Sequence, residues 1–304
     1  MDGALNFDKL MIDNKVIGFL VLISLLASCV KDVELEPGSY EPKIVIDGYI
    51  ESGRGANIYI TRSSPFLAEY DSASIRGSFV NNAKVTLSSS SGEKEVLTLF
   101  RNDSFFPPFI YRSVSISGEI GREYLIEVEL AGKKLRAVTT IPEAPEISDY
   151  QFKLESDTTG FPEILITQRR DKAQYFFAMV RSSLENENLH PTLEGVIRVQ
   201  AGSDAVWYTI QRVRERRMSY EGEHQPYYKS DFPKRQYHID DEVLVIPGAV
   251  DSISYRVILS LFKDLSARDN PFNFNNTGIE SNIEGGLGRW TGIARARPIV
   301  VSGK

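Results

Sequence analysis

The stretch GREYLIEVELAGKKLRAVTTI, residues 121–141, decides the fold class of this chain. Two runs within it alternate apolar and polar side chains, and the short turn Ala131-Gly132-Lys133 separates them. Alternation with a period of two is typical of a half-buried strand, and a glycine turn between two such runs predicts a β-hairpin.

The same pattern continues on the N-terminal side of the hairpin. Strands are predicted at residues 43–51, 57–63, 83–91 and 95–101. Gly48 interrupts the first of these strands and predicts a bulge or a bend. Short strands separated by turns every eight to twelve residues are typical of a β-sandwich of about 100 residues. We therefore predict an immunoglobulin-like or transthyretin-like sandwich over residues 42–141.

The pattern is interrupted at Pro142-Glu143-Ala144-Pro145. Proline cannot continue a central strand, so these residues predict a domain boundary. Beyond them, strands are predicted at residues 163–170, 174–183, 195–200, 205–217, 242–248 and 252–262. The Asn-, Gly- and Pro-rich tail, residues 270–301, predicts irregular loop with a final strand at 296–301. Residues 142–304 are therefore predicted to form a second β-rich domain with a glycine-rich C-terminal segment, which makes the whole protein all-β.

A secretory signal is predicted at the N-terminus. Residues 17–27, IGFLVLISLLA, are apolar and follow Lys15. The run is shorter than the roughly 20 residues that a membrane span needs. It ends in Leu26-Ala27-Ser28-Cys29, which resembles the lipobox of bacterial lipoprotein precursors. The resemblance implies cleavage of a signal peptide, residues 1–28, and acylation of Cys29; either Met1 or Met11 is the initiator.

The residues after the cleavage site are predicted to be a tether. Residues 29–41 begin with the lipidated Cys29 and continue with Lys31-Asp32 and Glu34. An acidic tract at this position resembles the surface-export signal of Bacteroidota lipoproteins, and a plain solvated linker is the alternative. Because Cys29 is the only cysteine, the mature chain can form no disulfide and no cysteine-based metal site.

Charge and motifs limit the possible functions. A formal net charge of −6 argues against a nucleic-acid-binding protein. No serine lies in a G-x-S-x-G motif and no cysteine nucleophile remains, so we expect a non-catalytic protein without a cofactor. His238 lies close to Asp240-Asp241-Glu242, but an acidic loop is a better account than a metal site, because no second ligand pair has diagnostic spacing.

Two further runs have alternative interpretations. Arg212, Arg214 and Arg216 would share one face of a strand and could bind a carboxylate or sulfate, although a solvated face is the simpler interpretation. The run Gly285-Gly286-Leu287-Gly288 predicts a turn or a close backbone approach rather than a phosphate-binding loop.

Aromatic residues supply the candidates for ligand or partner binding. Exposed tyrosine and tryptophan side chains stack on sugars or form protein interfaces, whereas buried ones belong to a core. The candidates are Trp207, Tyr220, Tyr227, Tyr228 and Tyr237.

Nearly the whole mature chain resembles Bacteroidota lipoproteins of domain of unknown function family 4249 (DUF4249). The resemblance rests on Cys29 and on residues 44–53, 57–66, 81–93, 124–145 and 270–292, the last containing SNI-x-GGLG-x-W. It implies a surface-exposed outer-membrane lipoprotein, an accessory or binding subunit of a TonB-dependent nutrient transporter, with an unknown nutrient as ligand. It implies no catalytic residues. A surface adhesive or structural lipoprotein without a transporter partner is the alternative.

Overall fold

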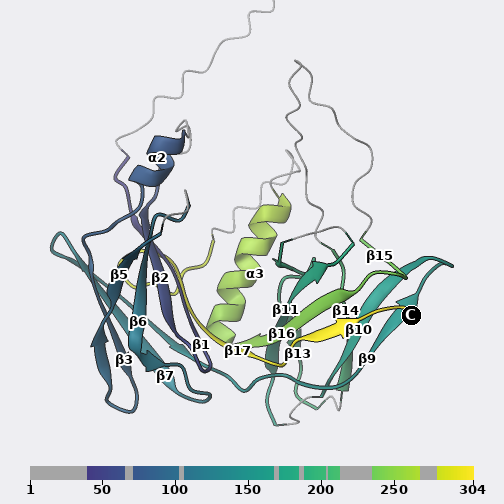
Figure 1. Cartoon of the computed structure of the whole chain (residues 1–304). Helices are drawn as coiled ribbons and strands as arrows, with labels where there is room; N and C mark the ends of the chain where they lie inside the picture. The colour runs from purple at the N-terminus through teal and green to yellow at the C-terminus, as the bar shows by residue number, and fades with distance from the viewer. Residues whose placement is uncertain are drawn as a thin grey trace, which may run out of the picture. The chain divides into compact units, whose positions relative to one another are not determined.

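The computed structural model describes residues 40–65, 71–102, 106–167, 171–184, 188–202, 205–212, 235–267 and 279–304. The predicted signal peptide, Cys29 and nearly all of the tether lie outside these ranges. Residues 42–304 form one compact unit, and the prediction of an all-β protein is confirmed for it (Figure 1).

Strands dominate the described chain in three sheets. Sheet A has ten strands: β1 (Ile44–Glu51), β2 (Gly55–Arg62), β5 (Thr98–Arg101), β6 (Phe109–Ser117), β11 (Gln174–Ser182), β12 (His190–Pro191), β13 (Ile197–Val199), β16 (Val243–Val250), β17 (Leu287–Arg295) and β18 (Ile299–Val301). Sheet C contains β3 (Lys84–Ser89), β4 (Lys94–Val96), β7 (Glu123–Leu130) and β8 (Lys133–Thr140). Sheet D contains β9 (Glu146–Leu154), β10 (Thr159–Thr167), β14 (Ala205–Thr209) and β15 (Tyr237–His238). The described residues contain the helices α2 (Ser72–Gly77) and α3 (Ser252–Ala267).

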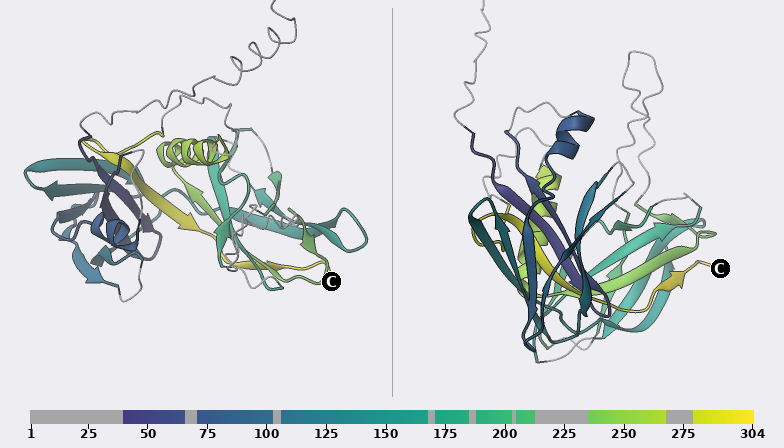
Figure 2. Two further views of the ribbon diagram at one scale, coloured as in Figure 1. Left: turned by 90° about the horizontal axis from the view of Figure 1, so that it is seen from above. Right: turned by 60° about the vertical axis from the view of Figure 1, so that its left-hand side comes forward.

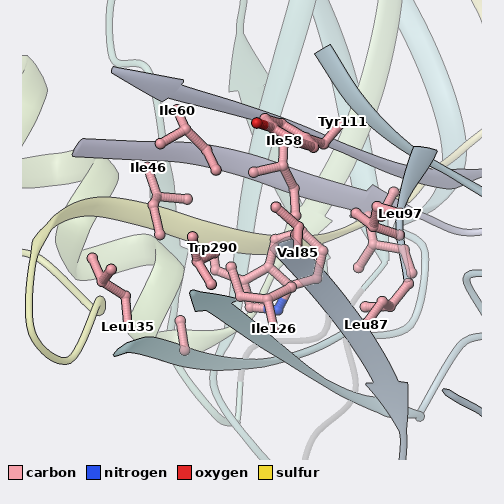
Figure 3. Packing of buried hydrophobic residues seen from close by; sticks show 14 of the residues in the cluster. Ile46, Ile58, Ile60, Val85, Leu87, Leu97, Tyr111, Ile126, Leu135 and Trp290 are labelled. Carbon is pink, nitrogen blue, oxygen red and sulfur yellow. The ribbon is translucent and has the colours of Figure 1, made fainter. Parts of the chain in front are cut away.

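The first sandwich packs sheet C against the strands β17, β1, β2 and β6 of sheet A, and β5 extends this sheet at its edge. Side chains from both sheets, among them Ile58 and Ile126, are fully buried in one apolar core (Figure 3). The predicted hairpin is confirmed as β7 and β8. Its turn residues Ala131 and Gly132 both have positive φ, 48° and 79°, as in the type I′ turn that suits a two-residue hairpin loop.

The second sandwich packs sheet D against β11, β16 and β18 of the same ten-stranded sheet. Its core contains Ile164 from β10 of sheet D, and Phe176 and Val245 from the neighbouring strands β11 and β16 of sheet A. The strand predicted at residues 242–248 is confirmed as β16. The prediction for residues 205–217 is confirmed for β14, at 205–209, and residues 213–217 lie outside the described ranges.

Strand β17 joins the two sandwiches. It pairs in parallel with β1 and antiparallel with β16, and its yellow ribbon can be followed between them in Figure 2. The prediction of irregular loop is therefore wrong for Leu287–Arg295. The partner of β1 lies about 240 residues downstream in the sequence. A pairing between segments so far apart cannot be recognised from the local sequence pattern.

Glycines allow β17 to lie against β1. A Cβ atom on Gly288 would stand 1.9 Å from the Ile46 carbonyl oxygen, and Gly288 has a φ of +111°. The predicted close backbone approach is confirmed. Gly48 faces Trp290 in the register, where a Cβ atom would stand 3.0 Å from the indole. Gly48 thus makes room for Trp290. The register is continuous on both sides of Gly48, so the bulge is wrong, and the bend stays a prediction.

Helix α3 replaces the strand predicted at residues 252–262. The Asp251 carboxylate accepts a hydrogen bond from the Ser254 amide at 2.6 Å, as an N-cap residue does. Ser254 and Val257 are buried three residues apart, which is helical spacing. The strand prediction is wrong here. The β-branched residues of this stretch favour a strand, but the aspartate cap and the tertiary contacts stabilise a helix.

Asp251 also contacts the first sandwich. Its Oδ2 atom accepts hydrogen bonds from the Thr139 hydroxyl at 2.8 Å and from the Thr140 amide at 3.0 Å. The start of α3 is therefore bonded to the end of β8. The boundary predicted at Pro142 stays a prediction, but the segment assigned to the second domain supplies Trp290 to the first core.

Candidate functional site

The two faces of sheet D have different roles. The register places Ile164 opposite Tyr208, and both side chains belong to the second core. Since side chains alternate along a strand, the residues between them face away from that core. We call this second surface the outer face; it consists of Asp149, Gln151, Lys153, Phe161, Glu163, Leu165, Trp207 and Thr209.

A buried carboxylate lies at the centre of the outer face. Glu163 on β10 is only 5% exposed. The Gln151 amide donates to its Oε2 atom at 2.9 Å, and the Thr209 hydroxyl donates to its Oε1 atom at 3.0 Å. The Lys153 ammonium lies 3.5 Å from Oε1. Both carboxylate oxygens therefore have partners on the two flanking strands, as a buried charge requires.

Trp207 stands beside this carboxylate on β14. It pairs with Leu165, and is therefore a diagonal neighbour of Glu163 across the two strands. Such neighbours are about 7–8 Å apart, which is within reach of an aromatic side chain. The indole is 41% exposed. The outer face thus combines a large exposed aromatic surface with hydrogen-bonding groups held in fixed positions.

Tyr237 is separated from Trp207 by the sheet itself. It pairs with Gly160 near the start of β10, is fully buried and belongs to the second core. The structure therefore contradicts Tyr237 as an exposed binding residue. Tyr220, Tyr227 and Tyr228 lie outside the described residues.

A buried ion pair lies near Tyr237. The Arg212 guanidinium is 3.5 Å from the Asp241 carboxylate and lies 4.5 Å from the centre of the Tyr237 ring. Asp241 also accepts the Ser182 hydroxyl at 2.6 Å. The interpretation of the arginine run as a solvated face is wrong for Arg212, which is 5% exposed; Arg214 and Arg216 lie outside the described residues.

The same contacts bear on the conceivable metal site. Asp241 is directed into the interior, whereas His238 lies 3.6 Å from the half-exposed Asp240 at the surface. The Lys304 ammonium, 2.7 Å from Asp240, holds the pKa of this carboxyl below its usual value. Over the ranges that the structure describes, no group of three His, Cys, Asp or Glu residues could hold a metal ion.

An open cavity of about 520 Å³ lies where β9 leaves the first sandwich. Ile147, Tyr150, Arg295 and Arg297 line it. Arg295 is 3.0 Å from the buried Glu51 carboxylate, so its charge is already balanced. Because the cavity is open and the charge of Arg295 in its lining is already balanced, it is a weaker candidate than the outer face.

The sequence pointed to Trp207 but not to its neighbours. Gln151 and Lys153 lie on β9, a strand that was not predicted, and Glu163 was not singled out within its predicted strand. The period-two spacing of Phe161, Glu163 and Leu165 shows which residues share a face. It does not show which strands lie beside them.

Comparison with known families identifies the chain. The profile of the family described as "Domain of unknown function (DUF4249)" matches residues 30–297. The chain belongs to the DUF4249 family. The resemblance seen in the sequence is thereby confirmed. No curated protein matches the DUF4249 chain.

Two solved structures resemble it weakly. A DUF4785 family protein from Legionella pneumophila subsp. pneumophila str. Philadelphia 1 aligns with 68% of the DUF4249 chain and 51% of its own, at 12% identity and a TM-score of 0.22. The FN1–FN3 domains of chicken CNTN1 align with 68% of the chain and 60% of their own, at 13% identity and a TM-score of 0.23. The chain thus spans about half to three-fifths of the length of these structures. In the described part of the DUF4249 chain, no helix combines the length and apolar character that crossing a bilayer requires.

Proposed function

We propose that this protein is a non-catalytic, lipid-anchored binding subunit that accompanies a TonB-dependent nutrient transporter at the surface of the outer membrane. The observation that carries the proposal is the order of segments at the N-terminus. A lipobox-like sequence ends at Cys29, an acidic stretch follows, and the first strand begins at Ile44. Even fully extended, the residues between would reach only about 50 Å. A lipid on Cys29 would therefore keep the sandwiches close to a membrane.

Two buried carboxylates, those of Glu163 and Asp241, support a binding role rather than catalysis. Both oxygens of Glu163 accept hydrogen bonds from Gln151 and Thr209. The Asp241 oxygens accept them from Ser182 and Ser183. A general acid or base needs an oxygen that can reach a substrate proton. These contacts instead fix the positions of the carboxylates.

A surface adhesive or structural lipoprotein is the second candidate. Among the described strands, edge strand β5 pairs with β6 alone, and its four residues are exposed. Leu99 on β5 and Val114 on the neighbouring β6 are 37% and 67% exposed. An open edge with apolar side chains can pair with a strand of another protein. This surface supports a protein partner whether or not that partner is a transporter.

Purification from the native membrane tests the proposal. The full-length protein, tagged after Lys304, would be extracted in a mild detergent, and the co-purifying proteins would be identified by mass spectrometry. We expect a TonB-dependent outer-membrane barrel in stoichiometric amount. Recovery of the protein alone in several mild detergents would contradict the transporter association and favour the adhesive role.

The lipid anchor has a separate test. A Cys29→Ala variant should lose incorporation of labelled palmitate and should leave the membrane fraction. A Ser28→Gly variant keeps the cysteine and a small residue before it, so it should behave as the wild type. An unchanged membrane fraction for Cys29→Ala would refute lipid anchoring at this residue.

A further inference from the structure

We infer that the outer face of sheet D binds a glycan, with one sugar ring stacked on Trp207 and neighbouring hydroxyl groups bound by Gln151, Lys153 and Thr209. This inference names the class of nutrient, so it deepens the proposed function and rests on it for its biological meaning. Binding of a sugar by the isolated protein needs no transporter and can be tested separately.

The exposed indole provides the stacking surface. One face of a pyranose ring carries mainly C–H groups, and these pack favourably against the electron-rich face of an aromatic ring. Trp207 is 41% exposed and projects from a strand, where only two side-chain torsions need to be fixed on binding. Leu165, its partner in the register, is half-buried and supports the apolar part of the surface.

The residues that contact Glu163 provide the polar groups of the proposed site. Because the Gln151 amide nitrogen donates to Glu163, the amide oxygen is directed elsewhere and can accept a hydrogen bond. The Thr209 hydroxyl likewise donates to Glu163 and keeps its acceptor capacity. Lys153 has a side chain that is 59% exposed and can donate further hydrogen bonds. Sugar hydroxyls both donate and accept, so this mixture of groups suits them.

The charges on the outer face argue against other ligands. The Lys153 ammonium balances the Glu163 carboxylate, and the exposed carboxylate of Asp149, opposite Leu165, makes the face unattractive to a phosphate. A metal ion would need further ligands, and no group of three metal-binding side chains lies in the described part of the chain. A protein interface of ordinary size has an apolar centre with charged groups depleted from it. Here a buried carboxylate occupies the centre of the face. An uncharged, hydroxyl-rich ligand fits this arrangement best.

The strands hold these groups before any ligand arrives. Trp207, Glu163 and Gln151 come from three adjacent antiparallel strands with continuous register on this part of the sheet. Preorganised groups lose little entropy on binding. A single ring makes few contacts, so we expect an affinity on the order of millimolar for one sugar and tighter binding for a chain of sugars.

Affinity electrophoresis of the full mature protein in detergent tests this inference. Native gels would contain amylopectin, laminarin, xylan or galactomannan, and the migration of the protein would be compared with a gel without polysaccharide. We expect at least one polysaccharide to retard the wild type. The Trp207→Ala variant should lose at least tenfold in affinity, and Trp207→Phe should lose less, because a smaller ring can still stack.

Tyr150→Ala is the matched control. Tyr150 is 52% exposed and lies on β9 of the same sheet, but it pairs with Ile164 and therefore belongs to the opposite face. It should bind as tightly as the wild type. A Thr209→Val variant keeps the shape of the side chain and should lose about three- to tenfold. Thermal denaturation of each variant would separate loss of binding from loss of folding.

Three outcomes would overturn the inference. These are retardation by none of the polysaccharides, equal binding by folded Trp207→Ala and wild type, and equal losses for Trp207→Ala and Tyr150→Ala. If Trp207→Ala instead releases a co-purified protein while no glycan binds, the outer face is a protein interface. Glycan binding without a co-purified barrel would leave the inference standing and refute the transporter association. A co-purified barrel without glycan binding would support the transporter association and overturn the inference.

Discussion

The two sandwiches share a sheet but fill their interiors with different chemistry. The first core is built from apolar side chains, and the polar atoms of its largest members bond to the backbone. The Trp290 indole donates to the Tyr124 carbonyl at 3.0 Å, and the Tyr124 hydroxyl donates to the Ser117 carbonyl at 3.1 Å. The second sandwich buries both partners of the ion pair of Arg212 and Asp241, whereas the buried carboxylate of the first, Glu51, pairs with the half-buried Arg295. The second also holds Glu163 buried on its outer face.

This difference predicts a division of roles. Apolar burial is the main favourable contribution to folding, whereas a buried ion pair recovers little more than its own desolvation. Such a pair nevertheless fixes the groups around it, because breaking it is costly. We therefore expect the first sandwich to provide most of the stability and the second to hold a binding surface in place.

The largest effect is expected from removal of Trp290. Trp290→Ala leaves a cavity between the two sheets of the first sandwich, where the side chain is fully buried. We expect a loss of about 3–5 kcal/mol in the free energy of unfolding. Urea denaturation followed by circular dichroism would measure it. Trp207→Ala is the control, with an expected change below about 1 kcal/mol; equal losses would refute the division of roles.

Removal of the Asp241 carboxylate is expected to have a similar or slightly smaller effect. Asp241→Ala takes away the negative charge beside buried Arg212 and the acceptor of the Ser182 hydroxyl. The loss should be about 3–4 kcal/mol. Glu129→Ala, which removes an exposed pair with Lys84, should cost less than about 1 kcal/mol. If Arg212→Met with Asp241→Leu restores the stability, the ion pair determines structure rather than stability.

The third prediction concerns the contact between β17 and β1. Gly288→Ala would place a Cβ atom 1.9 Å from the Ile46 carbonyl oxygen, so the parallel pairing must open. We expect a loss of about 2–4 kcal/mol from steric overlap and backbone strain. Gly92→Ala is the control, because Gly92 also has a positive φ but has nothing within 4 Å of the new atom. If the two variants lose equally, strain alone explains the effect.

The local elements of the first sandwich could be predicted from sequence. The hairpin of β7 and β8 follows from alternation and from its glycine turn, both of which are local properties. Strand β6 was missed because the residues Phe106-Pro107-Pro108 before it indicate a loop. Helix α3 was predicted as a strand because β-branched residues masked the aspartate cap.

Long-range pairing could not be predicted. Trp290 and Gly48 are partners in one ladder, yet neither position shows it in the sequence. The candidate site has the same difficulty: Gln151, Glu163 and Thr209 lie on three strands, and only their register brings them together. Trp207 could be proposed from the sequence alone, because the residue type by itself makes it a candidate for ligand or partner binding. Its polar neighbours required knowledge of the sheet.

The smallest effect concerns a carboxylate that joins the two sheets of the first sandwich. Glu95 on β4 accepts hydrogen bonds from the Val114 amide at 2.7 Å, the Ile116 amide at 2.9 Å and the Ser113 hydroxyl at 2.7 Å, all on β6. Burial raises the pKa of Glu95, but these hydrogen bonds lower it by more, so the pKa lies below its usual value. The folded state therefore favours the ionised form.

A lowered pKa fixes the direction of the pH dependence. The contribution of Glu95 to stability should be fully present above its ordinary pKa of 4.5 and should be lost as the pH falls through the lower value of the folded state. Glu95→Gln should cost about 1 kcal/mol at pH 7 and progressively less below pH 4.5. Urea denaturation at a series of pH values would measure this difference. A constant difference across the series would mean that Glu95 acts by shape alone, and the first sandwich would then depend on charge even less than the comparison of the two cores suggests.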